Sequence, residues 1–168
     1  DYQNLIAQEA QRGHTVAIHS ATHDYAKIYQ SVDAYFADFD EMNSIITAQT
    51  GKAADLVRFP GGSSNTISKK YCYGIMSQLV CAVEERGFRY CDWNVSSGDA
   101  GGTTSTSQVV ANVIEGIKSN NVSVVLQHDI KNFSVDAVEQ IIQWGLSEGY
   151  TFLPMTSTTP MSHHGVNN

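Results

Sequence analysis

The chain alternates between stretches with helical spacing of apolar residues and short apolar runs typical of strands. The clearest helix is predicted to begin after Ser31, a favourable N-cap, and to end before Gly51. Its apolar residues share one face and are Val32, Tyr35, Phe36, Phe39, Met42 and Ile46. Further helices are predicted at residues 3–12, 74–86, 108–118 and 134–148, and strands at residues 15–18, 55–59, 88–95, 122–126 and 150–153.

This alternation predicts an α/β fold. Consecutive strand–helix units favour a parallel sheet with right-handed crossovers, either open or closed into a barrel. A chain of 168 residues is long enough to bury a sizeable core, so a single domain over residues 1–168 is expected.

Polar residues gather where the predicted strands end. Four predicted strands end at such residues: His19 and His23, Arg58, residues 93–99, and His128 with Asp129. Because α/β folds place their active sites beyond the carboxyl ends of parallel strands, these residues are predicted to form one functional rim.

Two of these groups suggest a metal site and a ligand-binding turn. His19 and His23 are four residues apart and are candidate ligands for one divalent metal; the alternative is a pair of loop histidines satisfied by water and backbone. Arg58 places a permanent cation before the turn at residues 60–62, where two glycines let the backbone approach a ligand. A surface turn with a solvated arginine is the alternative.

The other groups suggest proton transfer and a substrate groove. His128 ends an apolar strand and can donate a proton near neutral pH, although a structural histidine fits the pattern equally well. Trp93 fits either a groove wall or the core. Asp99 follows Gly98, which favours a turn-stabilising role.

Composition excludes some classes of partner. The net charge is −7 and the ten basic residues form no run, so a nucleic-acid partner is not expected. No apolar run approaches the ~20 residues of a membrane span. Cys72, Cys81 and Cys91 lack the spacing of a zinc or redox motif; buried, inert thiols are expected, with a disulfide between two of them as the alternative.

Taken together, four strings resemble the motifs of the polysaccharide deacetylases with a NodB-homology domain, carbohydrate esterase family 4. The string HSATH at residues 19–23 is similar to the family's H-[ST]-x-x-H metal motif, and RFPGG at residues 58–62 to its R-x-P motif. Residues 93–100 resemble its groove-wall motif and residues 126–128 its L-x-H motif. The resemblance covers nearly the whole chain. Residues 93–106 and the tail at residues 163–168 are similar to the versions found in Gram-positive, clostridia-like bacteria.

The resemblance implies a parallel (β/α) barrel of the NodB type and a metal site within it. His19 and His23 would hold the metal, with zinc expected and cobalt, nickel or manganese as alternatives. Arg58 would orient the carboxylate that acts as base. The backbone N–H of Gly61, at a position where many relatives have tyrosine, would help to stabilise the oxyanion.

The resemblance also assigns the remaining residues. His128 would be the general acid, with Asp99 as the partner that keeps it protonated. Leu126 would line the pocket for the acetyl methyl group. Trp93 would belong to the groove wall. Ala100 stands where the family often has tryptophan, so the pocket wall is expected either to be more open or to be supplied by Trp93.

The family's first motif, T-F-D-D-G, supplies the catalytic base and the carboxylate metal ligand, and this string does not occur in the sequence. The domain is therefore expected to be N-terminally incomplete and its barrel to lack the first strands. A truncated piece is the favoured explanation; strands supplied by a second chain and a naturally short protein are the alternatives. Asp24, Asp99 or Asp129 could substitute as a ligand, but no spacing singles one out.

The resemblance implies removal of N-acetyl groups from an N-acetylglucosamine polymer such as peptidoglycan or a chitin-like glycan, outside the cell or at its surface. Residues 1–168 alone are expected to be inactive or very weakly active. The alternatives are a non-catalytic glycan-binding remnant of the fold and a hydrolase of small acylated amines.

Overall fold

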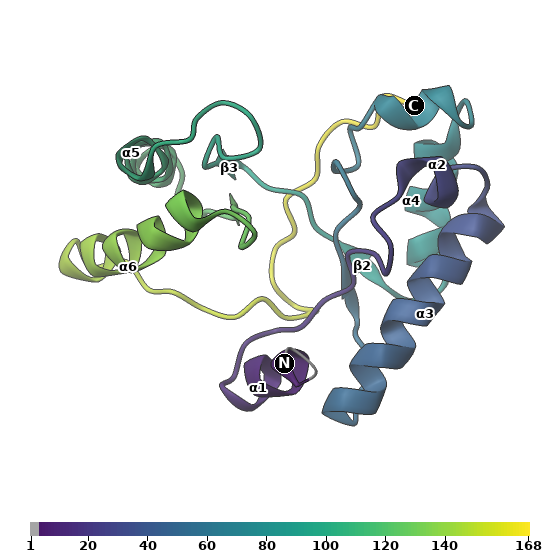
Figure 1. The fold of residues 1–168 in the computed structure, drawn as a ribbon, viewed down its shortest axis with the longest axis horizontal. Helices are drawn as coiled ribbons and strands as arrows, with labels where there is room; N and C mark the ends of the chain where they lie inside the picture. The colour runs from purple at the N-terminus through teal and green to yellow at the C-terminus, as the bar shows by residue number, and fades with distance from the viewer. Residues whose placement is uncertain (1–3) are drawn as a thin grey trace. The chain divides into compact units, whose positions relative to one another are not determined.

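The computed structural model describes residues 4–168, which form two compact units (Figure 1). The first unit comprises the described residues up to Asp92 together with Pro154–Asn168, and the second comprises Trp93–Leu153. No helix within residues 4–168 is both long and apolar enough to cross a lipid bilayer.

The first unit packs its helices around a short parallel strand pair. Its elements are α1 (Leu5–Gln11), α2 (Tyr25–Ile28), α3 (Val32–Thr50), β1 (Leu56–Val57), the 3-10 helix η1 (Ile67–Lys70), α4 (Ile75–Glu85) and β2 (Arg89–Tyr90). Strands β1 and β2 are parallel, with Leu56 opposite Arg89, and Ile18 adds a parallel bridge to Val57. The bridge brings the end of the predicted 15–18 strand beside β1.

Helix α3 forms as the sequence predicts. The Ser31 side chain accepts a hydrogen bond from the Ala34 N–H at 3.0 Å, and Gly51 ends the helix in the left-handed conformation with φ of 75°. The predicted apolar face is buried at Tyr35, Phe36, Phe39 and Ile46, which join the main core of the unit. One carboxylate, Asp38, is buried on the same helix.

The second unit repeats the strand–helix pattern on a smaller scale. Its elements are β3 (Val95–Ser96), α5 (Thr106–Lys118), β4 (Val125–Leu126) and α6 (Asn132–Ser147). Strands β3 and β4 are parallel, and α5 and α6 bury a core of Val109, Val113, Ile117, Ala137 and Ile141. Helix α5 lies close to β3, since a Cβ atom on Gly116 would stand 2.4 Å from the Val95 side chain.

Parallel strands that alternate with helices confirm the α/β class, but several strand predictions were wrong. The predicted strand 88–95 is divided into β2 and β3, because the backbone of the intervening residue Asp92 bonds elsewhere: its N–H donates to Ser162 O and its carbonyl oxygen accepts from Arg58 Nη2. Residues 150–153 form no strand. The Tyr150 N–H instead donates to Gly145 O at 2.8 Å and closes α6.

Other predictions differ in detail. The short helices α2 and η1 were not predicted, and the start of the predicted 3–12 helix lies outside the described residues. All three cysteines are free thiols, so the alternative of a disulfide was wrong. Cys91 is buried as expected. Cys81 is exposed because it is not on the buried side of α4, and Cys72, which precedes that helix, is half-buried.

Candidate functional site

The first unit contains the predicted metal motif in a short loop, residues 19–23, which we call the histidine loop. Ile18 enters the loop from its bridge with Val57, and α2 begins just after it. The rings of His19 and His23 face each other with their centroids 5.0 Å apart and their planes at 49°. The two predicted ligands therefore lie side by side.

The hydrogen bond of His19 fixes which of its nitrogens can bind a ligand. The His19 Nδ1 lies 2.7 Å from the backbone carbonyl oxygen of Arg58. Because a carbonyl oxygen can accept but not donate, Nδ1 must carry the proton. Nε2 is then the basic nitrogen, and this arrangement is typical of metal-binding histidines.

Asp38 of α3 holds the backbone between the two histidines. Its carboxylate accepts hydrogen bonds from the Ser20 hydroxyl at 2.6 Å, the Ala21 N–H at 2.9 Å, and both the N–H and the hydroxyl of Thr22 at 2.9 and 2.6 Å. Burial by itself would raise the pKa of the Asp38 carboxyl, but these hydrogen bonds outweigh it and hold the pKa below its usual value. Asp38 is therefore ionised at neutral pH.

Arg58 lies beside the histidine loop and is held by the backbone after β2. Its Nε donates to Cys91 O and its Nη2 to Asp92 O, both at 3.1 Å. The Asp92 carboxylate, fully buried, accepts from the Ser63 N–H at 2.8 Å and from the His164 N–H at 2.9 Å. The structure thus brings His19, His23 and Arg58 together, and Asp92 fastens the turn that follows Arg58.

The turn after Arg58 has a backbone conformation at position 61 that favours glycine. Gly61 has φ of 77°, and a Cβ atom there would stand 2.6 Å from the Tyr25 hydroxyl. The hydroxyl of buried Tyr29 donates to Pro60 O at 2.6 Å and holds the turn in place. The role of the Gly61 N–H in oxyanion binding stays a prediction.

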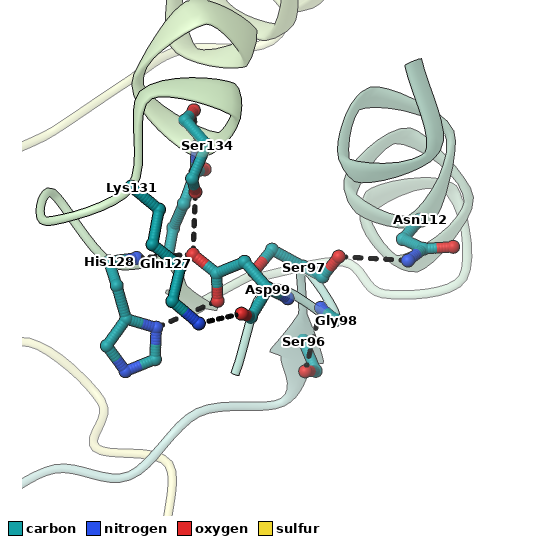
Figure 2. Close-up of polar contacts among 9 residues, drawn as sticks. All are labelled: Ser96, Ser97, Gly98, Asp99, Asn112, Gln127, His128, Lys131 and Ser134. Atoms are coloured by element: carbon teal, nitrogen blue, oxygen red, sulfur yellow. Dashed lines mark hydrogen bonds and ion pairs between the residues drawn. The ribbon is translucent and has the colours of Figure 1, made fainter. Parts of the chain in front are cut away.

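The second unit brings together the predicted acid and its partner (Figure 2). Asp99 follows β3 and His128 follows β4. The Asp99 carboxylate accepts from the His128 Nδ1 at 2.8 Å and from the His128 backbone N–H at 2.7 Å. Asp99 therefore fixes both the ring and the backbone of His128, which is more than a turn residue would do.

Asp99 is ionised at neutral pH. It is 1% exposed, and burial by itself would raise its pKa, but hydrogen bonds from Ser134, His128 and Ser97 outweigh burial and lower the pKa to about 2. A carboxylate can only accept, so the proton of this contact lies on His128 Nδ1. Nε2 is then the nitrogen that can meet a substrate, on a side chain that is 37% exposed.

The loop before Asp99 is built to hold it. The Asn112 side chain donates to Ser97 O at 2.9 Å (Figure 2). The Gly102 and Thr103 N–H groups donate to Gly98 O at 2.7 and 3.0 Å. Gly98 has φ of 80°, and a Cβ atom there would stand 2.7 Å from the Asn112 side chain. Lys131 also donates to Asp99 O.

The remaining predicted residues have simpler surroundings. Trp93 and Leu126 are half-buried in the second unit, which leaves part of each side chain accessible. Asp24 caps α2 by accepting from the Ala26 N–H at 2.9 Å, and Asp129 is exposed. Among residues 4–168, no three His, Cys, Asp or Glu side chains are grouped closely enough to hold a metal. Within these residues, His19 and His23 stand as a pair.

Sequence reasoning missed three residues that support the site: Asp38, Asp92 and Ser134. Asp38 gave a signal that could have been used, since a carboxylate between Tyr35 and Phe39 falls within the predicted apolar stripe of α3. A buried carboxylate needs partners, and the neighbouring hydroxyl-rich loop is a source of them. Asp92 and Ser134 gave no comparable signal.

Comparisons with known proteins agree with the resemblance found in the sequence. The family model for polysaccharide deacetylases matches residues 1–73. A peptidoglycan-N-acetylglucosamine deacetylase of Bacillus cereus is 30% identical over 157 residues, which are 90% of this chain and 54% of that protein. The chain thus spans about half the length of this relative.

Two solved structures are similar over nearly all of the chain. The catalytic domain of peptidoglycan N-acetylglucosamine deacetylase from Eubacterium rectale is 69% identical, with a TM-score of 0.98, and the match covers all of this chain and 77% of that one. A polysaccharide deacetylase from Bacillus cereus is 30% identical, with a TM-score of 0.80, and the match covers 96% and 77% of the two chains.

Proposed function

Because the chain belongs to the polysaccharide deacetylase family, we propose that it forms part of an enzyme that hydrolyses N-acetyl groups on an N-acetylglucosamine polymer. Peptidoglycan is the proposed substrate, since the relatives from Eubacterium rectale and Bacillus cereus are named for it. Such a polymer lies in the cell envelope, so we propose action outside the cell or at its surface.

The observation that best supports this function is the contact between Asp99 and His128. A buried carboxylate that is 1% exposed holds His128 Nδ1 at 2.8 Å and leaves Nε2 for the substrate. In hydrolysis of an acetamido group, the C–N bond breaks, the water oxygen joins the acetyl carbon, and the leaving nitrogen gains a proton. His128 would donate that proton from Nε2, and the Asp99 carboxylate would balance the positive charge of its ring.

The histidine loop suits a divalent metal, for which we propose zinc. His19 and His23 would hold it, because Nε2 of His19 is the basic nitrogen and the two rings lie 5.0 Å apart. Such an ion, when bound, polarises a carbonyl oxygen and lowers the pKa of water. Arg58, whose carbonyl oxygen accepts from His19 Nδ1, would orient the carboxylate base and keep the loop in place.

The carboxylate base and the third ligand would come from outside these residues. T-F-D-D-G does not occur among residues 1–168, so we propose that another segment or a second chain supplies it. We also propose that the two parallel strand pairs belong to a (β/α) barrel that such a segment completes. This would protect strand edges that otherwise favour aggregation.

A chimera tests this function. The part of the Eubacterium rectale catalytic domain that has no counterpart here would be joined to residues 1–168, and acetate release from N-acetylglucosamine oligomers would be measured with and without zinc. We expect zinc-dependent release from the chimera and little or none from residues 1–168. His128→Ala should lower release by about 100-fold or more, because proton transfer to the leaving group contributes about that much.

The matched control is His14→Ala, since His14 is exposed and belongs neither to the Asp99–His128 contact nor to the histidine loop. It should leave acetate release unchanged. A folded chimera that binds zinc and the oligomer but releases no acetate would contradict the proposal and favour a glycan-binding role. Strong release from residues 1–168 alone would contradict the proposal that the base lies elsewhere.

A further inference from the structure

Asp38 is an unusual residue for the buried face of a helix. It is 3% exposed and lies between Tyr35 and Phe39, whose side chains belong to the core of the first unit. Among the described residues, no Lys or Arg forms an ion pair with it. Burying a carboxylate is unfavourable unless hydrogen bonds replace its water, and here the donors are those of the histidine loop.

The four hydrogen bonds of Asp38 involve three consecutive residues, Ser20, Ala21 and Thr22. These are the residues between the two histidines. Both carboxylate oxygens take part, since Oδ1 accepts from Ser20 and Ala21 and Oδ2 accepts twice from Thr22. The contact therefore fixes the path of the loop backbone and not a single side chain.

The Ser20 hydroxyl passes this constraint on to His23. It donates to Asp38 and accepts from the His23 N–H at 2.8 Å. Within residues 4–168, His23 is the single non-glycine residue with a positive φ, at 53°. A non-glycine residue adopts this left-handed conformation at a cost and needs surrounding contacts to keep it there.

We propose that Asp38 is a positioning residue for metal binding: it holds the histidine loop in the conformation that places His23 beside His19. This inference rests on the proposed function, because it takes the two histidines to be metal ligands. The loop donors stabilise the buried carboxylate, and the carboxylate in turn stabilises the left-handed His23. Neither histidine needs to touch Asp38 for its position to depend on it.

The test is a zinc titration of the chimera, in which the added segment supplies a third metal ligand, followed by NMR of the histidine ring signals. The chain has six histidines, so the signals of His19 and His23 can be assigned by substitution. Asp38→Asn removes the charge and should replace part of the acceptor set with an N–H₂ group. We expect its zinc Kd to be about 10 to 100 times higher, the range found when a supporting contact of a metal ligand is lost.

Asp40→Asn is the matched control. It lies on the same helix, and Asp40 is exposed and pairs with Arg86 at 3.2 Å. Its zinc Kd should equal that of the unchanged protein. If Asp38→Asn does not fold, Thr22→Val removes one hydroxyl donor to Asp38 and should raise the Kd about fivefold, because one lost hydrogen bond corresponds to roughly that factor.

A folded Asp38→Asn or Thr22→Val chimera with an unchanged zinc Kd would overturn the inference, and so would the absence of zinc-induced shifts at His19 and His23 in the unchanged chimera. A loss of thermal stability without a change in Kd would show a structural role alone and would also overturn it. The acetate assay is independent of this test. A chimera that binds zinc without releasing acetate contradicts the proposed function and leaves the role of Asp38 standing.

Discussion

Each unit contains a buried aspartate that supports the candidate histidines, and these two aspartates, Asp38 and Asp99, act on the histidines in different ways. Asp99 contacts His128 directly, at both the ring and the backbone. Asp38 binds the residues between His19 and His23 and acts through the Ser20 hydroxyl. The direct contact with Asp99 fixes which ring nitrogen of His128 carries the proton. The indirect contact with Asp38 instead fixes the backbone conformation of the histidine loop. Changes at Asp99 should therefore affect proton transfer and changes at Asp38 should affect metal affinity.

The largest effect is expected for Asp99→Asn. The change removes the buried, charged acceptor of His128 Nδ1 and of the Ser134 hydroxyl. Because these donors lose their partner, the free energy of unfolding should fall by about 3 kcal/mol. Acetate release by the chimera should fall by about 100-fold or more, because the ring loses its fixed proton position. Urea unfolding and the acetate assay measure the two effects.

Asp136→Asn is the control, since Asp136 is exposed on α6 and should tolerate the change within about 0.5 kcal/mol. The zinc Kd should stay the same in both variants. A raised Kd in Asp99→Asn would break the division of roles between the two aspartates.

Acid should weaken the Asp99 contact over a defined range of pH. Its pKa is about 2 in the folded protein against a usual value of 3.8, so the stabilisation is complete above about pH 4 and is lost as the pH falls through 2. The shift corresponds to about 2 to 3 kcal/mol, as one pKa unit is about 1.4 kcal/mol. Asp38 contributes in the same direction because its pKa is also lowered.

The difference between the unchanged protein and Asp99→Asn isolates the contribution of Asp99. Unfolding free energies measured from pH 5 to pH 2 should converge as the pH falls. Parallel curves would mean that Asp99 titrates in the same range in the folded and unfolded chains.

The parts of the fold that follow from local patterns were predicted well, and the parts that depend on distant contacts were not. Helix α3 was predicted with its cap at Ser31 and its end at Gly51, because both signals lie in neighbouring residues. The division of the 88–95 strand was missed. It depends on the backbone of Asp92, which bonds to Ser162 and to the Arg58 side chain, 70 and 34 residues away in the sequence.

The same reason applies to the candidate site. The motifs and their order pointed to five residues: His19, His23, Arg58, Asp99 and His128. The structure brings the first three together in the first unit and the last two together in the second. Asp38 and Ser134 belong to no motif, and their importance comes from burial and from partners elsewhere in the chain. Such residues become visible when the fold is known.

The smallest effect is expected from two matched serine changes. Ser134 donates to Asp99 and Ser20 donates to Asp38, both at 2.6 Å. Ser134 is fully buried and Ser20 is half-buried, so water can replace the lost partner more readily at Ser20. Ser134→Ala should lower the unfolding free energy by about 2 kcal/mol and Ser20→Ala by about 1 kcal/mol. Although Ser20→Ala should cause the smaller loss of unfolding free energy, it should cause the larger rise in zinc Kd, because Ser20 also accepts from the His23 N–H. Equal changes in Kd in the two variants would mean that the two aspartates do not have separate roles.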